Sequence, residues 1–294
     1  MPPRFAIAST SDSHMRLHSR SSDSRPRMLR AAVPMSSTGR FVRGVAGFAI
    51  VFALAEVISR LGLISPRYLP PFSQSFVSMF QLLSDSAFLA AVGSTLVVSG
   101  IGLGVAVLVS VPIGLLLGSS NIAYESSRSL IDFIRPIPAL ALLPVAILVL
   151  GSGDSMKIAL ILFSASWPIL FNTIYGVHSV DKTAKETART FGMGRLRILW
   201  KVALPSALPL AYTGIRLAAT MALLITVGLE ILVGSSSGGG VGAWLVGVGA
   251  SYGTAELLYG GVILLGLMGW ALNFGLVALG RKLFGWHVSV RMTR

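Results

Sequence analysis

Few residues of this 294-residue chain have side chains suited to chemistry, and many of them gather in one segment. Residues 181–205, DKTAKETARTFGMGRLRILWKVALP, form the one strongly basic and polar stretch inside an otherwise apolar sequence. These charges flank a narrow apolar stripe, Ala184, Ala188 and Phe191, which has the i, i+4, i+7 spacing of one helix face. Such a surface is suited to docking into a groove of a partner rather than to catalysing a reaction.

Motifs for nucleotide hydrolysis and for hydrolytic catalysis are missing from the sequence. A phosphate-binding loop requires G-x-x-x-x-G-K-[ST], and residues 176–183, GVHSVDKT, depart from it at Asp181, where the second glycine should stand. A carboxylate at that position would repel phosphate. The sequence also lacks H-E-x-x-H and cysteine, and its four histidines are scattered. We therefore expect no enzyme activity, and no metal or cofactor bound by this chain itself.

Two short helices are predicted to present residues 181–205. Asp181 is a suitable N-cap for a helix from Lys182 to about Phe191, because its carboxylate can accept the free amide protons of the first turn. Gly192 follows directly, and a glycine there can adopt the left-handed conformation that ends a helix. A second helical pattern follows, and Pro205, which lacks an amide donor, is predicted to begin a new helix.

The same segment resembles the EAA loop of ABC-transporter permeases. The pattern of that loop is Glu-Ala-Ala, three residues, Gly, nine residues, an aliphatic residue, one residue and Leu-Pro, and this chain departs from it only at Thr187. In the family, the loop is the coupling helix that sits in a cleft of the ATPase subunit. The resemblance implies an ATPase-coupling role for Glu186, Ala188, Gly192, Leu204 and Pro205. The alternative is an amphipathic loop that only lies on the membrane surface.

The resemblance also implies a fold and a set of partners. The fold class is all-α, a polytopic membrane protein of six transmembrane helices with the type I ABC importer permease fold, similar to that of a methionine importer. Two copies would form a homodimer around the pathway, and an extracytoplasmic substrate-binding protein would deliver the solute. ATP and Mg would be bound by separate cytoplasmic ABC ATPase subunits, whose closure would move the coupling loops.

Composition independently indicates a protein embedded in membrane lipid. Hydrophobic residues make up 53% of the chain and charged residues 12%, and the mean hydropathy is +0.77. Several uncharged runs exceed the about 18 residues that a spanning helix needs. The net charge of +13 would suggest a nucleic-acid partner in a soluble protein. Here the basic residues lie between apolar runs, where they report topology, so no nucleic acid is expected.

Six spans are expected within a permease domain at residues 41–290. The basic cytoplasmic tail at residues 1–40 is expected to be disordered, because it is too polar to fold alone. Its content of arginine and serine also resembles an organellar transit peptide, and a later start at Met28 or Met35 would remove most of it. The expected spans are 44–64, 88–118, 137–151, 158–180, 208–233 and 257–280. Residues 241–250 are apolar but too short to cross, so an interfacial or re-entrant helix is predicted there. Lysine and arginine concentrate in the tail, in residues 181–205 and near the C-terminus. The positive-inside rule therefore places both termini and residues 181–205 on the cytoplasmic side of the membrane, which is expected to be a bacterial-type inner membrane.

A second run narrows the resemblance to one branch of these permeases. Residues 135–144, RPIPALALLP, resemble the Arg-x-Ile-Pro-x-Leu-Ala-x-Leu-Pro run of the nitrate/sulfonate/taurine branch. That branch implies a small anion such as a sulfonate, taurine or nitrate as the solute. Relatives of similar sequence are thought to move pyrimidine vitamin precursors or aromatic acids, and the soluble binding protein largely sets selectivity. The substrate therefore stays open at this point.

Polar residues inside the expected spans are candidates for the pathway or its gate. Asn172 and Glu230 are the two we single out, since a polar or ionisable residue within a span is a functional candidate by default. The alternatives are a hydrogen bond between helices for Asn172 and hydration near the membrane surface for Glu230. Glu56 and Arg60 lie four residues apart on one helix face and are predicted to form an ion pair.

Glycine spacing predicts close helix packing in the span at residues 88–118. Gly100 and Gly104, and then Gly114 and Gly118, form two pairs four residues apart, a spacing that lets another helix approach closely.

Two other classes of function are alternatives to the importer. An ion-coupled secondary transporter would need coupling carboxylates within its spans and often has inverted repeats. Glu56 and Glu230 are the available carboxylates, and no repeat is visible. A membrane scaffold would need no ATPase partner at residues 181–205.

Overall fold

The computed structural model describes residues 37–234, 239–250 and 255–284. Every regular element in these residues is a helix, which confirms the all-α class predicted from the sequence. The chain divides into two units, residues 1–48 and 49–294, and the packing described below is that of the second unit.

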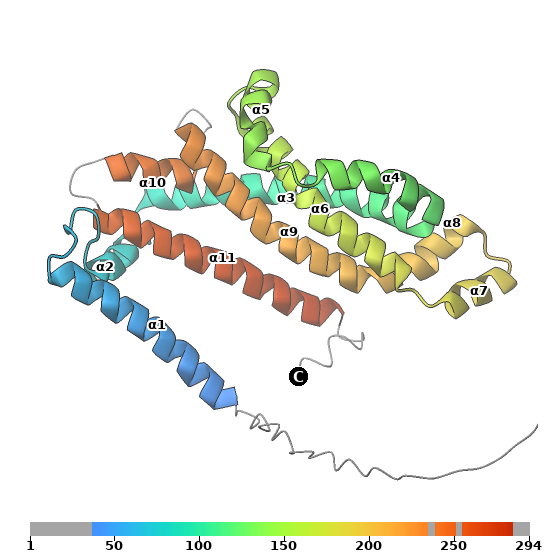
Figure 1. Ribbon diagram of the computed structural model, residues 1–294, viewed down its shortest axis with the longest axis horizontal. Helices are drawn as coiled ribbons and strands as arrows, with labels where there is room; N and C mark the ends of the chain where they lie inside the picture. Colours follow the sequence, from blue (N-terminus) through green and yellow to red (C-terminus); the bar gives the residue numbers. More distant parts are fainter. Residues whose placement is uncertain (1–36, 235–238, 251–254, 285–294) are drawn as a thin grey trace, which may run out of the picture. The chain divides into compact units, whose positions relative to one another are not determined.

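The order of the helices is shown in Figure 1. They are α1 (Ser37–Arg60), α2 (Phe72–Leu82), α3 (Ser86–Ser119), α4 (Asn121–Ile134), α5 (Leu143–Leu150), α6 (Asp154–His178), α7 (Lys182–Thr190), α8 (Arg195–Ile198), α9 (Leu204–Val233), α10 (Val241–Ala250) and α11 (Ala255–Leu283). Two irregular turns join them, a 3-10 turn (η1, Ala139–Leu142) before α5 and a π-helical turn (η2, Leu199–Ala203) between α8 and α9. The tail predicted at residues 1–40 lies almost wholly outside the described residues.

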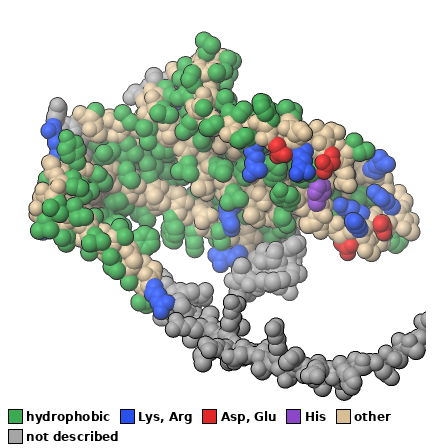
Figure 2. All heavy atoms as spheres, viewed as in Figure 1, with side chains coloured by type: hydrophobic (Ala, Val, Ile, Leu, Met, Phe, Trp, Pro, Cys, Tyr) green, Lys and Arg blue, Asp and Glu red, His purple; other side chains and the backbone are tan. Residues whose placement is uncertain are grey.

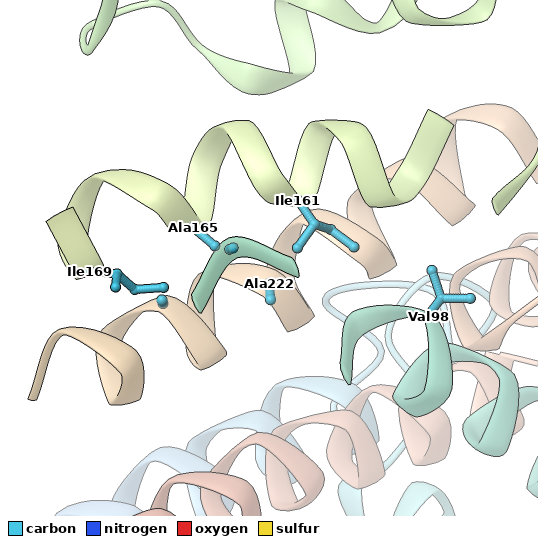
Figure 3. Packing of buried hydrophobic residues seen from close by; sticks show 7 residues of the cluster. Val98, Ile161, Ala165, Ile169 and Ala222 are labelled. Atoms are coloured by element: carbon cyan, nitrogen blue, oxygen red, sulfur yellow. The ribbon is translucent and has the colours of Figure 1, made fainter. Parts of the chain in front are cut away.

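The core is built on α6, which packs along both α3 and α9. Figure 3 shows Val98 of α3, Ile161, Ala165 and Ile169 of α6, and Ala222 of α9 in one cluster. All of these are almost fully buried. Alanine leaves little side chain between two helices, so their backbones approach closely, as is usual for helices packed within a membrane. α6 is therefore the central helix of the described bundle.

Glycines of α3 show which of the two predicted close-packing pairs contacts α6. A Cβ atom on Gly114 would lie 2.7 Å from an α6 side chain, and one on Gly118 would lie 2.9 Å away. There is no room for a side chain at either position, so the predicted close packing is confirmed for this pair. Within the described residues, nothing lies within 4 Å of a Cβ built on Gly100 or Gly104. Gly102, which lies between them, is the residue that meets α6, at 2.7 Å. The glycine spacing thus indicated that α3 packs closely against another helix, but it did not show which side of α3 contacts α6.

The spans follow the expected order, with one marked difference. Among the described residues, five helices are long and apolar enough to cross a membrane, at residues 42–60, 86–119, 154–178, 195–233 and 255–283. Residues 137–151, the expected third span, instead hold η1 and α5. These pass as a span only together with α4, across a bend of 75°. Pro136 and Pro138 explain the break, because proline lacks an amide donor and disfavours helix at the residue before it.

Pro205 does not interrupt the helix in which it lies. It sits in the first turn of α9, where the sequence predicts a helix start. However, α8, η2 and α9 continue one another, so residues 195–233 form a single 39-residue helix. The amide of Leu204 donates to the carbonyl of Leu199, five residues back, and this wider π-type turn accommodates the proline ring. The prediction of a separate helix beginning at Pro205 was therefore wrong.

Glu56 and Arg60 form the predicted ion pair, with 2.6 Å between Arg60 Nε and Glu56 Oε1. The Glu56 carboxylate also accepts hydrogen bonds from the backbone amide and the hydroxyl of Ser73, at 3.0 and 2.8 Å. This carboxylate therefore joins the end of α1 to the start of α2, which is a structural role.

Gly214 gives a direct test of the contact between α6 and α9. A Cβ atom there would lie 2.6 Å from the carbonyl oxygen of Pro168 and 2.8 Å from the Cβ of Asn172. We expect Gly214→Ala to destabilise the folded protein by about 1–3 kcal/mol, because the two helices must separate. Thermal unfolding in detergent measures the effect. Gly228→Ala, on the same helix but with its nearest neighbour at 3.9 Å, should be neutral or slightly stabilising, and equal losses in both variants would contradict this packing.

Candidate functional site

Residues 181–205 form a compact projection at one end of α6 and α9, whereas α5 and α10 lie toward the other end (Figure 1). α7 occupies Lys182–Thr190, and the Asp181 carboxylate accepts a hydrogen bond of 2.8 Å from the amide of Thr183. The predicted helix and its N-cap are thus confirmed. Figure 2 shows charged side chains gathered at this end of the bundle, over α4, α7 and α8, while apolar side chains cover most of the visible surface elsewhere.

The end of α7 is closed by two hydrogen bonds around Gly192. The Gly192 amide donates to the carbonyl of Arg189 at 2.9 Å, and the Met193 amide donates to the carbonyl of Ala188 at 3.1 Å. This pairing is the Schellman motif, which requires a left-handed residue at the glycine position. Gly192 has a φ of +75°, so the predicted left-handed helix end is confirmed. The turn fixes the direction in which the chain leaves α7.

The side chains of α7 divide between an inner and an outer face. Ala188 is 7% exposed and packs toward the bundle, whereas Phe191 at the end of the helix is 80% exposed. Ala184 and Glu186 are also exposed. The predicted stripe of Ala184, Ala188 and Phe191 is therefore not one continuous free surface. The surface available to a partner is formed by Glu186 and Phe191, with Ala188 seating the helix.

Two further contacts hold α7 against the bundle. The Nζ atom of Lys185 donates to the carbonyl of Val177 in the last turn of α6, at 3.0 Å. Burial lowers the pKa of Lys185, and the nearby charge of Arg189 lowers it further. α7 also contacts η2, which directly precedes Leu204 and Pro205. The structure thus places Glu186 and Ala188 on α7, Gly192 in the turn that ends α7, and Leu204 and Pro205 beyond η2 at the start of α9.

Glu230 is fully buried, at 0% exposure, at the opposite end of α9 from α7. Its carboxylate accepts hydrogen bonds from the hydroxyl of Thr95 at 2.9–3.0 Å and from the amide of Gly242 at 3.0 Å. The Thr95 hydroxyl in turn accepts the amide of Val241, at 2.9 Å. Glu230 therefore holds the first residues of α10 against α3 and α9. We call Thr95, Asp154, Lys157 and Glu230 the Glu230 cluster.

Lys157 is a member of this cluster that the sequence analysis did not single out. It is 0% exposed, and its Nζ atom lies 3.9 Å from Glu230 Oε1 and 3.0 Å from Asp154 Oδ1. Placing the fourth span from residue 158 left this lysine in a loop, although α6 already begins at Asp154. One signal in the sequence could have identified Lys157. A lysine at the edge of one apolar segment can pair with a glutamate inside another, here Glu230.

Asn172 lies in the C-terminal half of α6 and is partly buried. Its side-chain amide donates to the carbonyl of Pro168 at 2.8 Å, and its Cβ faces Gly214 of α9. The structure therefore brings Asn172 to the contact between α6 and α9, and not into the Glu230 cluster. Its expected role in a pathway stays a prediction.

Comparison with known proteins identifies the family. The profile of the family described as "Binding-protein-dependent transport system inner membrane component" matches residues 110–284, which include α4 to α11 in large part. This chain belongs to that family. It is the membrane-spanning permease component of an ABC importer, a multi-pass protein of the inner membrane. Such a component is a transport subunit rather than an enzyme, and the family implies an ATPase and a substrate-binding protein as partners.

Individual relatives cover most of the chain. The putative aliphatic sulfonates transport permease protein SsuC of Bacillus subtilis strain 168 is 31% identical over 258 residues, 85% of this chain and 89% of the relative. The taurine transport system permease protein TauC of Escherichia coli strain K12 is 29% identical over 248 residues, 83% of this chain and 89% of the relative.

Solved structures share the fold. The MetNI methionine ABC transporter, in an inward facing conformation, matches with a TM-score of 0.55 at 23% identity, over 66% of this chain and 94% of that one. A bacterial ABC transporter that imports the acidic polysaccharide alginate matches with a TM-score of 0.60 at 12% identity, over 83% of this chain and 99% of that one. The importer permease fold predicted from the sequence is confirmed.

Proposed function

We propose that this permease moves a small anion such as a sulfonate, taurine or nitrate into the cell, as one half of a homodimer. The proposal on the solute rests on the relatives named for aliphatic sulfonates and taurine, each of which aligns with more than four fifths of this chain. ATP and Mg are bound and ATP is hydrolysed on separate cytoplasmic ATPase subunits. The observation that carries the coupling part is α7, capped at both ends, with Glu186 and the aromatic Phe191 both exposed.

In this mechanism α7 is the coupling helix. Its outer face docks in a cleft of the ATPase, where Glu186 offers a charge and Phe191 an apolar anchor. Its inner face is fixed by Ala188 and by the hydrogen bond from Lys185 to Val177. When two ATPases close on ATP, each docked α7 moves as a rigid body with them. The contact of α7 with η2 then passes the displacement to α9.

The long helix explains how a movement at α7 would reach the pathway. Residues 195–233 are one helix, so a shift at its α7 end is carried along its full length. Because α6 packs along α9, and α3 along α6, these helices move with it. The Glu230 cluster lies where α9 ends, next to α10. A displacement that begins at the ATPase would therefore reach the far end of the bundle.

The orientation and the second copy are part of the same proposal. If α7 meets a cytoplasmic ATPase, both termini lie in the cytoplasm, as the distribution of lysine and arginine predicts. The substrate-binding protein then docks at the end that holds α5 and α10. α5 is only 8 residues long and has no buried residue, with Leu148 85% exposed. The apolar side chains that α5 leaves exposed offer a surface against which the second copy would pack.

A secondary transporter is not favoured by the geometry of its candidate carboxylates. Glu56 is paired with Arg60 and hydrogen-bonded to Ser73. Glu230 is buried with Lys157 and accepts two protein donors. Both carboxylates thus have protein partners that a transported ion would have to displace.

The test is association of the full chain with its candidate ATPase. Wild type should co-purify with the ATPase in detergent, whereas Glu186→Arg should lower the amount recovered about tenfold or more, since reversing a docked charge costs several kcal/mol. Glu125→Arg is the control, because Glu125 is an exposed α4 residue at the same end of the bundle. Undiminished association of Glu186→Arg, or an equal loss in the control, would show that α7 is not the docking site.

A further inference from the structure

A cavity of about 490 Å³ lies behind α7, on the side turned away from Glu186. Its walls come from the end of α3, the end of α6, α7, α8 and η2. Three basic side chains line it, Lys185 and Arg189 from α7 and Arg195 from α8, together with the hydroxyls of Ser119 and Ser120. The remaining lining is apolar. The cavity therefore combines hydrogen-bond donors with an apolar wall at one end of the membrane helices.

Among the described residues, no carboxylate oxygen lies within 4.0 Å of the charged nitrogens of Lys185, Arg189 or Arg195. The ion pairs among the described residues have Arg60, Arg128 and Lys157 as their cations. None of them involves the three basic residues of the cavity. Lys185 uses one of the three N–H donors of its ammonium group in the hydrogen bond to the carbonyl of Val177. The two arginines keep planar donor groups that bind phosphate in bidentate fashion. An anion in the cavity would relieve the mutual repulsion of Lys185 and Arg189.

We propose that this cavity binds the phosphate group of an anionic phospholipid such as phosphatidylglycerol. Free phosphate would satisfy the same donors, but the apolar wall favours the lipid. Leu116, in the last turn of α3, lines the cavity and is 59% exposed, so it can contact the glycerol and acyl part of a lipid. Basic pockets where spanning helices end are typical sites for anionic headgroups.

A lipid held there would act as part of the structure around α7. Its phosphate would bridge α7, through Lys185 and Arg189, to α8, through Arg195. These two helices are joined by the turn at Gly192 and contact each other. The bound lipid would therefore stiffen the projection from behind while leaving its outer face free. This inference depends on the chain being embedded in a membrane and does not depend on ATPase docking.

The experiment measures lipid retained by the full-length chain after purification in a mild detergent, by native mass spectrometry. Protein exchanged into phosphatidylglycerol should keep bound lipid, and protein exchanged into phosphatidylcholine, which has the same phosphate but no net charge, should keep much less. The double variant Arg189→Gln/Arg195→Gln should reduce retained phosphatidylglycerol about tenfold or more, since losing one charge-assisted hydrogen bond already changes an equilibrium by roughly that factor.

Two controls separate the cavity from general surface charge and from misfolding. Arg197→Gln removes the same charge from α8, but Arg197 does not line this cavity and should not alter retention. Arg189→Lys/Arg195→Lys keeps the charges and should restore most of the binding lost in the glutamine pair. Wild-type retention in the glutamine pair, an equal loss in Arg197→Gln, or equal retention of phosphatidylcholine would overturn the proposal. Displacement of phosphatidylglycerol by millimolar inorganic phosphate would assign the site to free phosphate and would also overturn it.

Discussion

Gly192→Pro is expected to lower ATP-driven transport about a hundredfold while the membrane helices remain folded. Proline fixes φ near −65°, whereas Gly192 has a φ of +75°. Proline also lacks the amide that donates to Arg189 in the native turn. The Schellman motif would be lost at a cost of about 3 kcal/mol or more, which corresponds to roughly a hundredfold change in the population of a correctly placed α7. Transport in proteoliposomes with ATPase and binding protein measures the effect.

A graded series on the two neighbouring glycines makes this test specific. Gly192→Ala keeps the amide but places a Cβ on a left-handed residue, at a cost of about 1–2 kcal/mol, so a loss of roughly tenfold is expected. Gly194 has an ordinary φ of −67°, and no atom of the described residues lies within 4 Å of a Cβ placed there, so Gly194→Ala should transport like wild type. A loss in Gly194→Ala equal to that in Gly192→Ala would mean that flexibility, and not the left-handed turn, is what matters.

Local signals made α7 predictable. A capping aspartate, a short run of helix-forming residues and a following glycine determine its two ends through contacts within a few residues, and these contacts formed as expected. The break before α5 is also caused by local residues, Pro136 and Pro138. Hydropathy alone overlooked it, because an average over a window does not register a missing amide donor.

Tertiary contacts were less accessible to sequence reasoning. The spacing of Gly114 and Gly118 showed that a helix could approach α3, but the choice between this pair and Gly100/Gly104 depends on where α6 lies. Lys157 and Glu230 are far apart in the sequence, and only the packing of α6 beside α9 makes them partners. A lysine next to an apolar run looks like a loop residue until its partner is known. The walls of the cavity behind α7 come from five elements, and no sequence motif indicated that these would meet.

Lys157→Met is expected to destabilise the folded protein by about 3–5 kcal/mol, because it leaves the Glu230 carboxylate buried without a cation. Glu230→Gln should be milder, at about 1–3 kcal/mol. The glutamine can still accept the amide of Gly242, and Lys157 keeps Asp154, whose carboxylate lies 3.0 Å away and is half exposed. Thermal unfolding in detergent measures both effects. Lys201→Met, at an exposed position, is the control and should change stability by less than about 0.5 kcal/mol.

The double variant Lys157→Met/Glu230→Gln decides between an anchor and a gate. If the pair only anchors α10, removing both charges should recover most of the stability lost in Lys157→Met, and transport should recover with it, because no buried charge is left unpaired. If Glu230 acts as a gate through its charge, the double variant will be stable and still inactive in transport. No recovery of stability at all would contradict the pairing itself, since the two residues would then be contributing independently. The 3.9 Å separation and complete burial of both side chains lead us to expect recovery of stability and of transport together.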